Sequence, residues 1–178
     1  MIEETLTRPI IATARLVLRP PVAEDAPRLA ELANDFEVAG MTTTIPHPYT
    51  LADAEAFIGR ARSAEPAKEA LFAIELSGEG VIGTLGLDPD GTLAHEVGYW
   101  IGRSYWGRGY VTEALIAGLG WARADWGRRC VTARHFIDNP ASAAVLAKAG
   151  FLYTGRQETR FCVARAQPVL SRWMVWLA

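Results

Sequence analysis

Residues 96–114 read EVGYWIGRSYWGRGYVTEA and carry the densest structural signal in the chain. They predict a strand that passes through a short turn, containing Gly107 and Gly109, directly into a helix. Backbone N–H groups at the start of a helix point outward, and the helix dipole there favours negative charge. Glycine in the turn lets an anion approach without meeting a Cβ atom. The stretch therefore predicts a phosphate site at the start of the helix.

Neighbouring side chains would complete this phosphate site. Arg103 and Arg108 add positive charge, and the hydroxyl of Thr112 can donate a hydrogen bond. Two common phosphate loops do not fit the stretch. The Walker loop needs Gly-Lys-Ser/Thr after its spacer, and the chain has no such run. The pattern Gly107-x-Gly109-x-x-Thr112 begins like the dinucleotide fingerprint but lacks its third Gly.

The flanking segments predict an α+β fold, in which helices flank a mixed, mostly antiparallel sheet. Turn signals at 77–80 and 88–91 separate three strand-like runs and indicate an antiparallel meander. Residues 35–49 are predicted as a long loop. The predicted strands are 14–20, 71–76, 81–87, 93–101, 130–137, 151–156 and 173–177. The predicted helices are 23–34, one that opens at 50–53, one along 111–122, and one from Asn139 to Gly150.

The composition is that of one globular domain over residues 1–178. The chain has 18 Lys plus Arg against 20 Asp plus Glu, a net charge of −2, and 50% of its residues are hydrophobic. This balance, with scattered arginines, argues against nucleic acid as a partner. The acidic N-terminus and the lack of a long apolar run predict a cytoplasmic protein without membrane contact. Cys130 and Cys162 lack metal-ligand spacing, so we expect reduced thiols and no bound metal.

Several ordered motifs give the chain a resemblance to a known family. They are ARLVLR at 14–19, PYT at 48–50, EVGYW at 96–100, YWGRGYVTEA at 105–114, and Asn139-x-x-Ser142-x-x-Val145-Leu146-x-Lys148-x-Gly150-Phe151. In this order and at these distances they resemble the GNAT superfamily of acyltransferases, in its RimJ/RimL-like branch of N-acetyltransferases. The resemblance covers nearly the whole chain. One departure is that Trp106 and Val111 stand at the first and last positions of the superfamily pattern Gln/Arg-x-x-Gly-x-Gly/Ala.

The resemblance implies a GNAT-like fold and acetyl-CoA as the acetyl donor. The donor would lie where strands 96–101 and 130–137 splay apart, with its pyrophosphate on the amides of residues 107–112. A backbone N–H near Trp100 or Ile101 would stabilise the oxyanion of the reaction. The implied cofactor-binding residues are Trp100, Ile101, Gly107, Arg108, Gly109, Tyr110, Val111, Thr112, Asn139 and Ser142. The implied reaction transfers the acetyl group directly to a primary amine, without a covalent enzyme intermediate.

Glu96 and Ser142 are the catalytic candidates of this resemblance. An amine must lose a proton before it attacks, and Glu96 would act as the base through a water molecule. The alternative is that Glu96 is a solvated strand carboxylate. Ser142 would face the thioester sulfur, or would simply suit the first turn of a helix that Asn139 caps. Rim-type members have a tyrosine acid at a position that corresponds to Leu146 here.

The acceptor amine has two possible classes. It is an N-terminal peptide amine, as in ribosomal-protein acetylation, or the amine of a small molecule. Phe36, Tyr49 and Trp100 are predicted to form the walls of the substrate pocket, with His47 at its rim. A different class of function is a CoA-binding sensor module that keeps the phosphate loop without turnover. The terminal strands permit a monomer or a homodimer.

Overall fold

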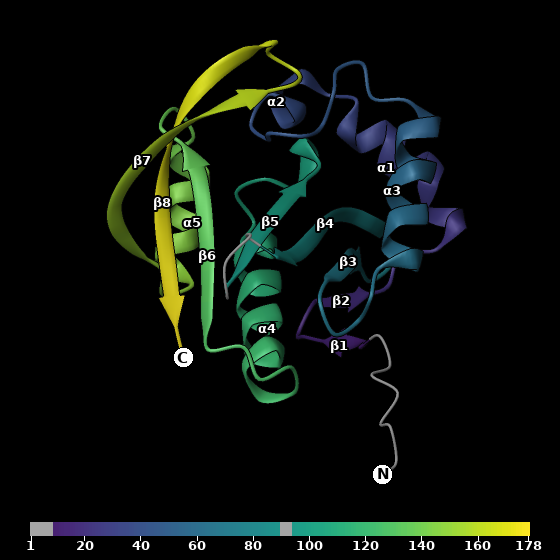
Figure 1. Ribbon diagram of the computed structural model, residues 1–178. Helices are drawn as coiled ribbons and strands as arrows, with labels where there is room; N and C mark the ends of the chain where they lie inside the picture. The colour runs from purple at the N-terminus through teal and green to yellow at the C-terminus, as the bar shows by residue number, and fades with distance from the viewer. Residues whose placement is uncertain (1–8, 90–93) are drawn as a thin grey trace.

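The strands form one mixed sheet that helices flank. A computed structural model describes residues 9–89 and 94–178. Within these residues the sheet has eight strands in the order β1-β2-β3-β4-β5-β6-β8-β7 (Figure 1). The strands are β1 (Ile11–Ala12), β2 (Leu16–Arg19), β3 (Ala70–Leu76), β4 (Gly80–Pro89), β5 (His95–Ile101), β6 (Cys130–Phe136), β7 (Leu152–Cys162) and β8 (Gln167–Leu177). The helices are α1 (Ala26–Ala33), α2 (Phe36–Ala39), α3 (Leu51–Ser63), α4 (Tyr110–Ala124) and α5 (Pro140–Lys148), with short 3₁₀ turns η1 (Ala23–Asp25) and η2 (Arg103–Tyr105).

Neighbouring strands of this sheet are antiparallel except for β5 and β6. β3, β4 and β5 form the antiparallel meander that the turn signals predict. The chain then passes through α4 and returns in β6, parallel to β5. A parallel pair needs such a crossover, and α4 supplies it. The predicted mixed, mostly antiparallel sheet is confirmed.

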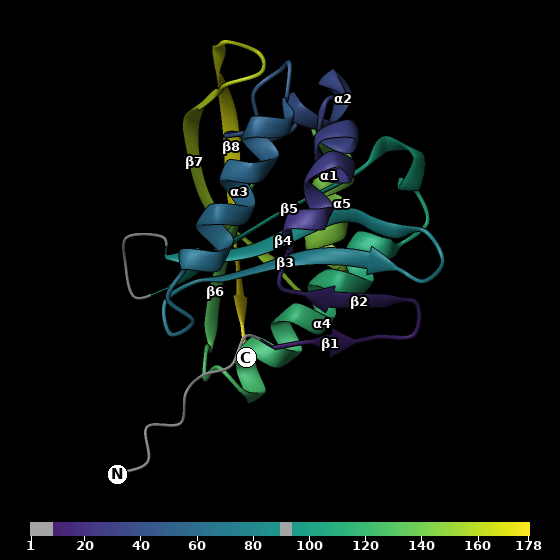
Figure 2. The same ribbon diagram turned by 90° about the vertical axis from the view of Figure 1, so that its right-hand side faces the viewer.

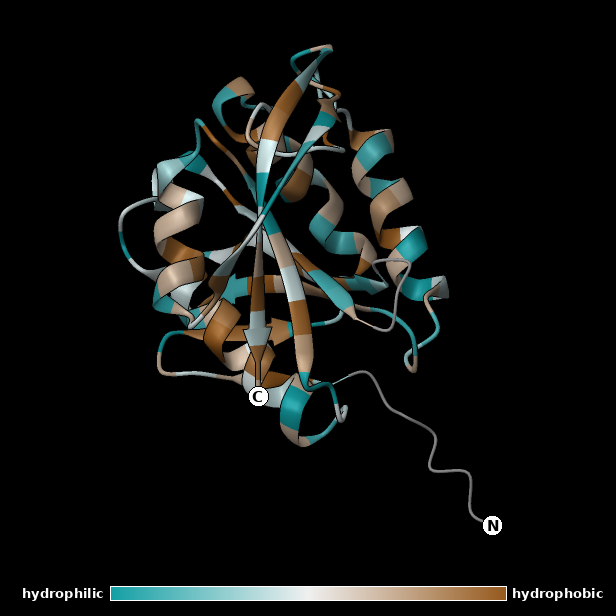
Figure 3. Cartoon of the chain, turned by 60° about the vertical axis from the view of Figure 1, so that its left-hand side comes forward, coloured by the Kyte–Doolittle hydropathy of each residue, from teal (hydrophilic) through white to brown (hydrophobic). Residues whose placement is uncertain are grey.

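The sheet separates two layers of helices. Helices α1 and α3 pack on one face, which we call the α1/α3 face, and α4 and α5 cover the other, the α4/α5 face (Figures 1 and 2). Figure 3 shows hydrophobic and hydrophilic segments alternating along strands of the C-terminal half. Alternation is expected where the two faces of a strand have different surroundings. The core of the α1/α3 layer is made by Ala26, Leu29, Ala54, Ile58, Ala73 and Val81.

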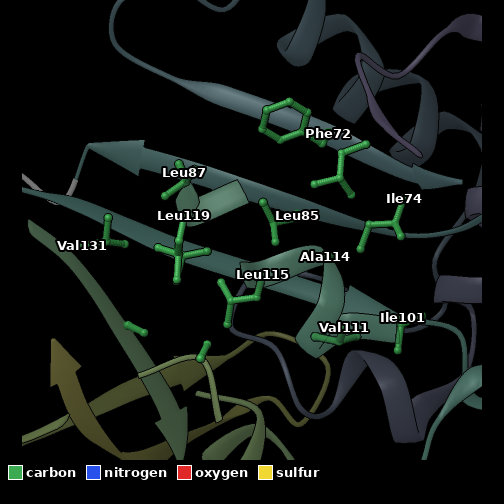
Figure 4. Packing of buried hydrophobic residues seen from close by; sticks show 14 of the residues in the cluster. Phe72, Ile74, Leu85, Leu87, Ile101, Val111, Ala114, Leu115, Leu119 and Val131 are labelled. Carbon is green, nitrogen blue, oxygen red and sulfur yellow. The ribbon is translucent and has the colours of Figure 1, made fainter. Parts of the chain in front are cut away.

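The larger core lies between α4 and the sheet. Leu115 and Leu119 of α4 point toward Leu85 and Leu87 of β4, with Val131 of β6 nearby (Figure 4). All five side chains are buried. The helical spacing of apolar residues along the predicted helix produces this stripe. Its burial holds the start of α4 in a fixed position relative to the end of β5.

β5 and β6 pair over only a short length. Their register joins residues 95–97 to residues 131–133, and the described pairing ends there. β4 stays paired with β5 as far as Ile101, and β8 stays paired with β6 as far as Phe136. Beyond Val97 the two middle strands diverge, as Figure 1 shows. The predicted splay of these strands is confirmed.

Two helix starts follow the predicted capping chemistry. The hydroxyl of Thr50 accepts a hydrogen bond from the N–H of Asp53, and the Asp53 carboxylate accepts one from the N–H of Thr50. Asn139 Oδ1 accepts a hydrogen bond from the N–H of Ser142, so α5 begins at the predicted place. Gly150 follows the end of α5 with a φ of 91°, in the left-handed region that favours glycine.

The structure differs from the prediction in the loop and strand lengths. Residues 35–49, predicted as a loop, contain the short helix α2, which Asp35 caps by accepting a hydrogen bond from the N–H of Glu37. β1 is not predicted, because a strand of two residues is too short to show a periodic pattern. β7 and β8 are 11 residues each, longer than predicted. β7 lies at the sheet edge with mostly exposed side chains, so it lacks the apolar alternation that marks a strand.

Part of one predicted turn and strand lies outside the described residues. These are residues 90–93, in the predicted turn 88–91 and at the start of the predicted strand 93–101. Cys130 and Cys162 are free thiols. Among the helices that the structure describes, none is long and apolar enough to cross a bilayer.

The packing of α4 against the sheet leads to a prediction about the stability of the protein. Leu115 is fully buried, whereas its neighbour Ile116 is 51% exposed. Replacing Leu115 by Ala leaves a cavity against β4, so Leu115→Ala should lower the free energy of unfolding by about 2–5 kcal/mol. Ile116→Ala is the matched control and should change it by less than about 0.5 kcal/mol. Urea unfolding measures both; equal effects would show that α4 does not pack as described.

Candidate active site

The turn before α4 presents a row of backbone N–H groups. Gly107 and Gly109 have φ angles of 73° and 77°, in a region that residues with a Cβ rarely adopt. The first hydrogen bond of α4 runs from the N–H of Glu113 to the carbonyl of Gly109. The N–H groups of residues 110–112 therefore have no partner within the helix, and no described side chain caps them. Such a row of outward N–H groups is what an anion site requires.

Arg15, between β1 and β2, ties this turn to the first strands of the sheet. Its guanidinium donates to the Glu113 carboxylate at 2.7 Å and to the carbonyl of Arg108 at 3.0 Å. The same guanidinium lies over the ring of Tyr110, 4.5 Å from the ring centroid. The Thr13 hydroxyl and the Arg15 N–H also donate to Glu113, at 2.6 and 2.9 Å. These contacts hold the backbone of the turn from one side.

The Glu113 carboxyl is kept ionised by these contacts. Burial by itself would raise its pKa, but the hydrogen bonds from Thr13 and Arg15, with the charge of Arg15, outweigh burial and lower the pKa below the ordinary 4.5. Sequence reasoning missed this contact because Arg15 and Glu113 are far apart in the chain. Both residues lie in motifs that carry the family resemblance, but spacing alone gives no sign that they meet.

An open groove of about 530 Å³ runs beside the start of α4. It is lined by Thr13, Gly109, Thr112, Glu113, Ile116, Ala117 and Lys148. Lys148, at the end of α5, adds positive charge near the row of N–H groups, and Arg108 is exposed at the turn. Arg103 instead forms an ion pair with Asp35, at 3.1 Å. The charge expected from Arg103 is thus directed to the α1–α2 connection, not to the phosphate turn.

The gap between β5 and β6 exposes backbone groups of β5. The N–H of Gly102 donates to a carbonyl of β4 at 2.9 Å. Successive residues of a strand turn their backbone groups to opposite edges, so the N–H of Trp100 also faces β4, whereas those of Tyr99 and Ile101 face the gap. The carbonyl of Ile101 accepts a hydrogen bond from the indole N–H of Trp106, at 2.9 Å. Of the two residues predicted near the oxyanion, Ile101 is the one whose N–H faces the gap.

Tyr99 and Ser142 meet on the α4/α5 face of this gap, with 3.0 Å between the Tyr99 hydroxyl and Ser142 Oγ. Burial raises the pKa of Tyr99 to about 12, against a smaller lowering by Ser142, so the hydroxyl stays protonated at neutral pH. Leu146, at the position that corresponds to the tyrosine of Rim-type members, is fully buried in the core. Tyr99 is not among the residues that the sequence predicts for the site. Side chains alternate along a strand, so Tyr99 projects from the other face of the sheet than Glu96. This alternation is the sequence signal that could have identified Tyr99.

On the α1/α3 face, an arginine of β6 holds Glu96. Both carboxylate oxygens of Glu96 accept hydrogen bonds from the Arg134 guanidinium, at 2.6 Å each. Arg134 lies over the ring of Trp173, 4.6 Å from its centroid, and the Trp173 indole N–H donates to Glu158 at 3.0 Å. Glu96 is therefore not a freely solvated strand carboxylate. Sequence reasoning missed Arg134, because pairing of the two strands was predicted without its register.

Two of the three predicted pocket walls come together. Tyr49 and Trp100 both pack against the core of the α1/α3 layer and against the small cluster of Ala33, Ala39 and Ile45. Burial raises the pKa of Tyr49 to about 12, so its hydroxyl is neutral. Phe36 is 47% exposed and packs edge-on against His47, with 5.6 Å between the ring centroids. Tyr49 and Trp100 thus share both clusters, and Phe36 lies outside them.

The sequence of residues 15–152 matches the family described as an acetyltransferase (GNAT) domain. The chain belongs to the GNAT acetyltransferase family. The matched segment contains the glycine turn, the splayed strands and α5, which together form the candidate site. The resemblance seen in the sequence motifs is confirmed, and the protein is an acetyltransferase of this family.

Solved GNAT structures share the fold of this acetyltransferase at low sequence identity. RimJ from Mycobacterium smegmatis, in complex with CoA-disulfide, has a TM-score of 0.81 and 22% identity, over 97% of this chain and 89% of that one. RimL, a ribosomal L7/L12 alpha-N-protein acetyltransferase in complex with coenzyme A, has a TM-score of 0.82 and 18% identity, over 95% and 98%. The microcin C7 self-immunity acetyltransferase MccE, in complex with acetyl-CoA and AMP, has a TM-score of 0.81 and 16% identity, over 93% and 94%. At these identities the likeness shows the shared fold.

The Glu113 contacts predict a pH-dependent stability. Because the pKa of Glu113 is lowered in the folded state, its contribution is present above the ordinary pKa of 4.5 and is lost as the pH falls through the lowered folded value. Glu113→Gln should therefore destabilise the protein at neutral pH, and the difference from wild type should shrink toward acid. Urea unfolding at stepwise lower pH measures this difference.

Glu55→Gln is the control for this titration, because Glu55 is an exposed carboxylate on α3. It should show little destabilisation at either end of the pH range. A Glu113→Gln penalty that stayed constant with pH would contradict the ionised contact with Arg15.

Proposed function

We propose that this GNAT protein transfers an acetyl group from acetyl-CoA directly to a primary amine. The observation that carries the proposal is a row of N–H groups without helical partners, at residues 110–112, next to the splay of β5 and β6. The row of N–H groups suits a diphosphate. The unpaired edge of β5 suits the extended, amide-containing arm of the coenzyme, which can add to the strand. MccE holds acetyl-CoA, and RimL holds coenzyme A, in the same fold.

The proposed donor site combines the glycine turn with the gap. The N–H groups at the start of α4 would receive the diphosphate, and Lys148 would add charge from the side of α5. The N–H of Ile101 would hydrogen-bond the thioester carbonyl at the end of β5, with Asn139 and Ser142 at the start of α5 beside the arm. The residues proposed for the turn are Gly107, Arg108, Gly109, Tyr110, Val111 and Thr112.

The reaction needs two proton transfers from the acceptor. The ammonium loses a proton before it attacks, and Glu96 is proposed to receive the ammonium and accept this proton, directly or through water. The amine nitrogen then bonds to the thioester carbon, and the N–H of Ile101 stabilises the oxyanion. As the C–S bond breaks, the nitrogen gives up its second proton and the thiolate leaves as the thiol. Ser142, whose Oγ lies 3.0 Å from the Tyr99 hydroxyl, is proposed to hydrogen-bond the departing sulfur.

The acceptor is proposed to approach from the α1/α3 face. Trp100 lies on the same strand face as Glu96 and packs against the same cluster as Tyr49, so these rings would flank the acceptor chain next to its amine. Phe36 would contact only a longer acceptor, because it lies outside that cluster. The proposed acceptors are an N-terminal peptide amine, as for the ribosomal-protein acetyltransferase RimL, and the amine of a small molecule.

Release of free thiol from acetyl-CoA, measured over a panel of peptides and small amines, tests this function. We expect release with at least one amine, together with an acetylated product of the expected mass. Tight coenzyme binding without release across the panel would instead support a CoA-binding sensor module.

A substitution in the turn tests the donor site. Gly109 has a φ of 77°, and a Cβ there would lie 3.5 Å from the Arg15 guanidinium, so Gly109→Val strains the turn and covers the N–H groups. Coenzyme binding in titration calorimetry should be lost. Gly78→Val is the matched control, since Gly78 has a φ of 80° in the β3–β4 turn, with open space around its Cβ position. Retained affinity in Gly109→Val would contradict the diphosphate placement.

A second substitution tests the proposed base. Glu96→Gln keeps the shape of the side chain but removes its charge, so only amine that is already neutral should react. Turnover should fall at neutral pH and its pH dependence should move upward, while coenzyme affinity stays nearly unchanged. Steady-state rates against pH, with calorimetry of coenzyme binding, measure both. Unchanged turnover at all pH values would remove Glu96 from the mechanism.

A further inference from the structure

A second carboxylate lies directly opposite Glu96. The register of β4 and β5 pairs Asp88 with Glu96, and pairs Gly86 with Gly98 two residues further along. Opposite residues of an antiparallel pair project from the same face of a sheet. Asp88 therefore lies on the α1/α3 face beside the proposed base, although sequence reasoning placed it in a turn and gave it no role.

The residues between these two carboxylates and Trp100 are glycines, and the space over Gly98 is open. A Cβ on Gly98 would meet no described atom within 4 Å. A Cβ on Gly86 would lie 2.8 Å from Cδ2 of Leu71 and 3.5 Å from Oδ2 of Asp88, so the space over Gly86 is filled by Leu71 and the Asp88 carboxylate leans along β4 toward it. Asp88 thus reaches toward the level of Gly98, where β5 and β6 have begun to separate.

The two carboxylates differ in how their oxygens are used. Both oxygens of Glu96 accept hydrogen bonds from Arg134, at 2.6 Å each, so Glu96 must give up one of these bonds to take a proton. Oδ1 of Asp88 is buried and has no hydrogen-bond partner in the described part of the chain. Asp88 can therefore be protonated without breaking a hydrogen bond at that oxygen.

We propose that Asp88 is a second catalytic carboxylate and the final acceptor of the proton that the acceptor ammonium loses. Glu96 receives the ammonium and its proton, passes the proton on to Asp88, and returns to its bonds with Arg134. The inference rests on the proposed function, since it needs an amine on the α1/α3 face. One N–H bond of the ammonium breaks and one O–H bond of Asp88 forms, so the amine becomes neutral and attacks the thioester. Asp88 returns this proton to solvent after the product leaves.

The surroundings of Asp88 suit a proton acceptor. Burial raises its pKa, the charge of Arg60 on α3 opposes this, and the charges of Glu69, before β3, and of Glu96 raise the pKa further. A carboxylate whose pKa is raised toward the working pH is a better general base than an ordinary one.

The test compares the pH dependence of kcat/KM for wild type and Asp88→Asn with an alkyl amine that the wild type acetylates. Asn keeps the shape of the side chain but cannot take the proton. We expect a loss of about 100-fold at neutral pH, which shrinks as the pH approaches the pKa of the amine, because neutral amine needs no base. Asp125→Asn is the matched control, since Asp125 is exposed at the far end of α4, and it should match wild type throughout.

The possible results separate this inference from the proposed function. Coenzyme affinity and thermal melting of Asp88→Asn should match wild type, which shows that the variant is folded. A loss that is the same at every pH would mean that Asp88 has only a structural role, and an unchanged rate would mean that it has none. Either result overturns the inference while the proposed function stands. A wild type that acetylates no amine overturns both.

Discussion

In the part of the chain that the structure describes, three residue pairs join β5 to β6, and the candidate site depends on the fact that the pairing stops after Val97. In a complete sheet the backbone groups of Tyr99 and Ile101 would bond to β6, and no ligand could enter. The gap stays open because β4 holds β5 and β8 holds β6 on their outer edges. Helix α4, packed by Leu115 against β4, fixes the glycine turn at the mouth of the same gap. The stability of the core thus maintains an unpaired strand edge.

The two faces of the sheet carry different chemistry at this gap. The α4/α5 face offers hydrogen-bond donors, namely the N–H groups at the start of α4 and the hydroxyls of Tyr99 and Ser142. The α1/α3 face offers the carboxylates of Asp88 and Glu96, and Arg134 is bound to Glu96. Donors suit an anionic diphosphate and a departing thiolate, whereas carboxylates suit a cationic amine. In this account the two reactants approach the gap from opposite faces.

Local sequence signals predict most of this fold, whereas contacts between distant segments are not predictable from them. The turn at Gly109, the stripe through Leu115 and the cap at Asn139 are encoded within a few residues, so their positions follow from spacing and backbone chemistry. The bonds from Arg15 to Glu113 and from Arg134 to Glu96 depend on strand register and on how α4 crosses the sheet. β7 was predicted too short because an exposed edge strand has no buried face to mark it.

The most direct test of the central claim is a crystal structure of the protein with acetyl-CoA bound. We expect the diphosphate on the N–H groups of residues 110–112 and the thioester carbonyl within hydrogen-bond distance of the N–H of Ile101. The extended arm of the coenzyme should lie between β5 and β6. A bound donor whose diphosphate lies away from the glycine turn, with the gap between the strands empty, would contradict the account.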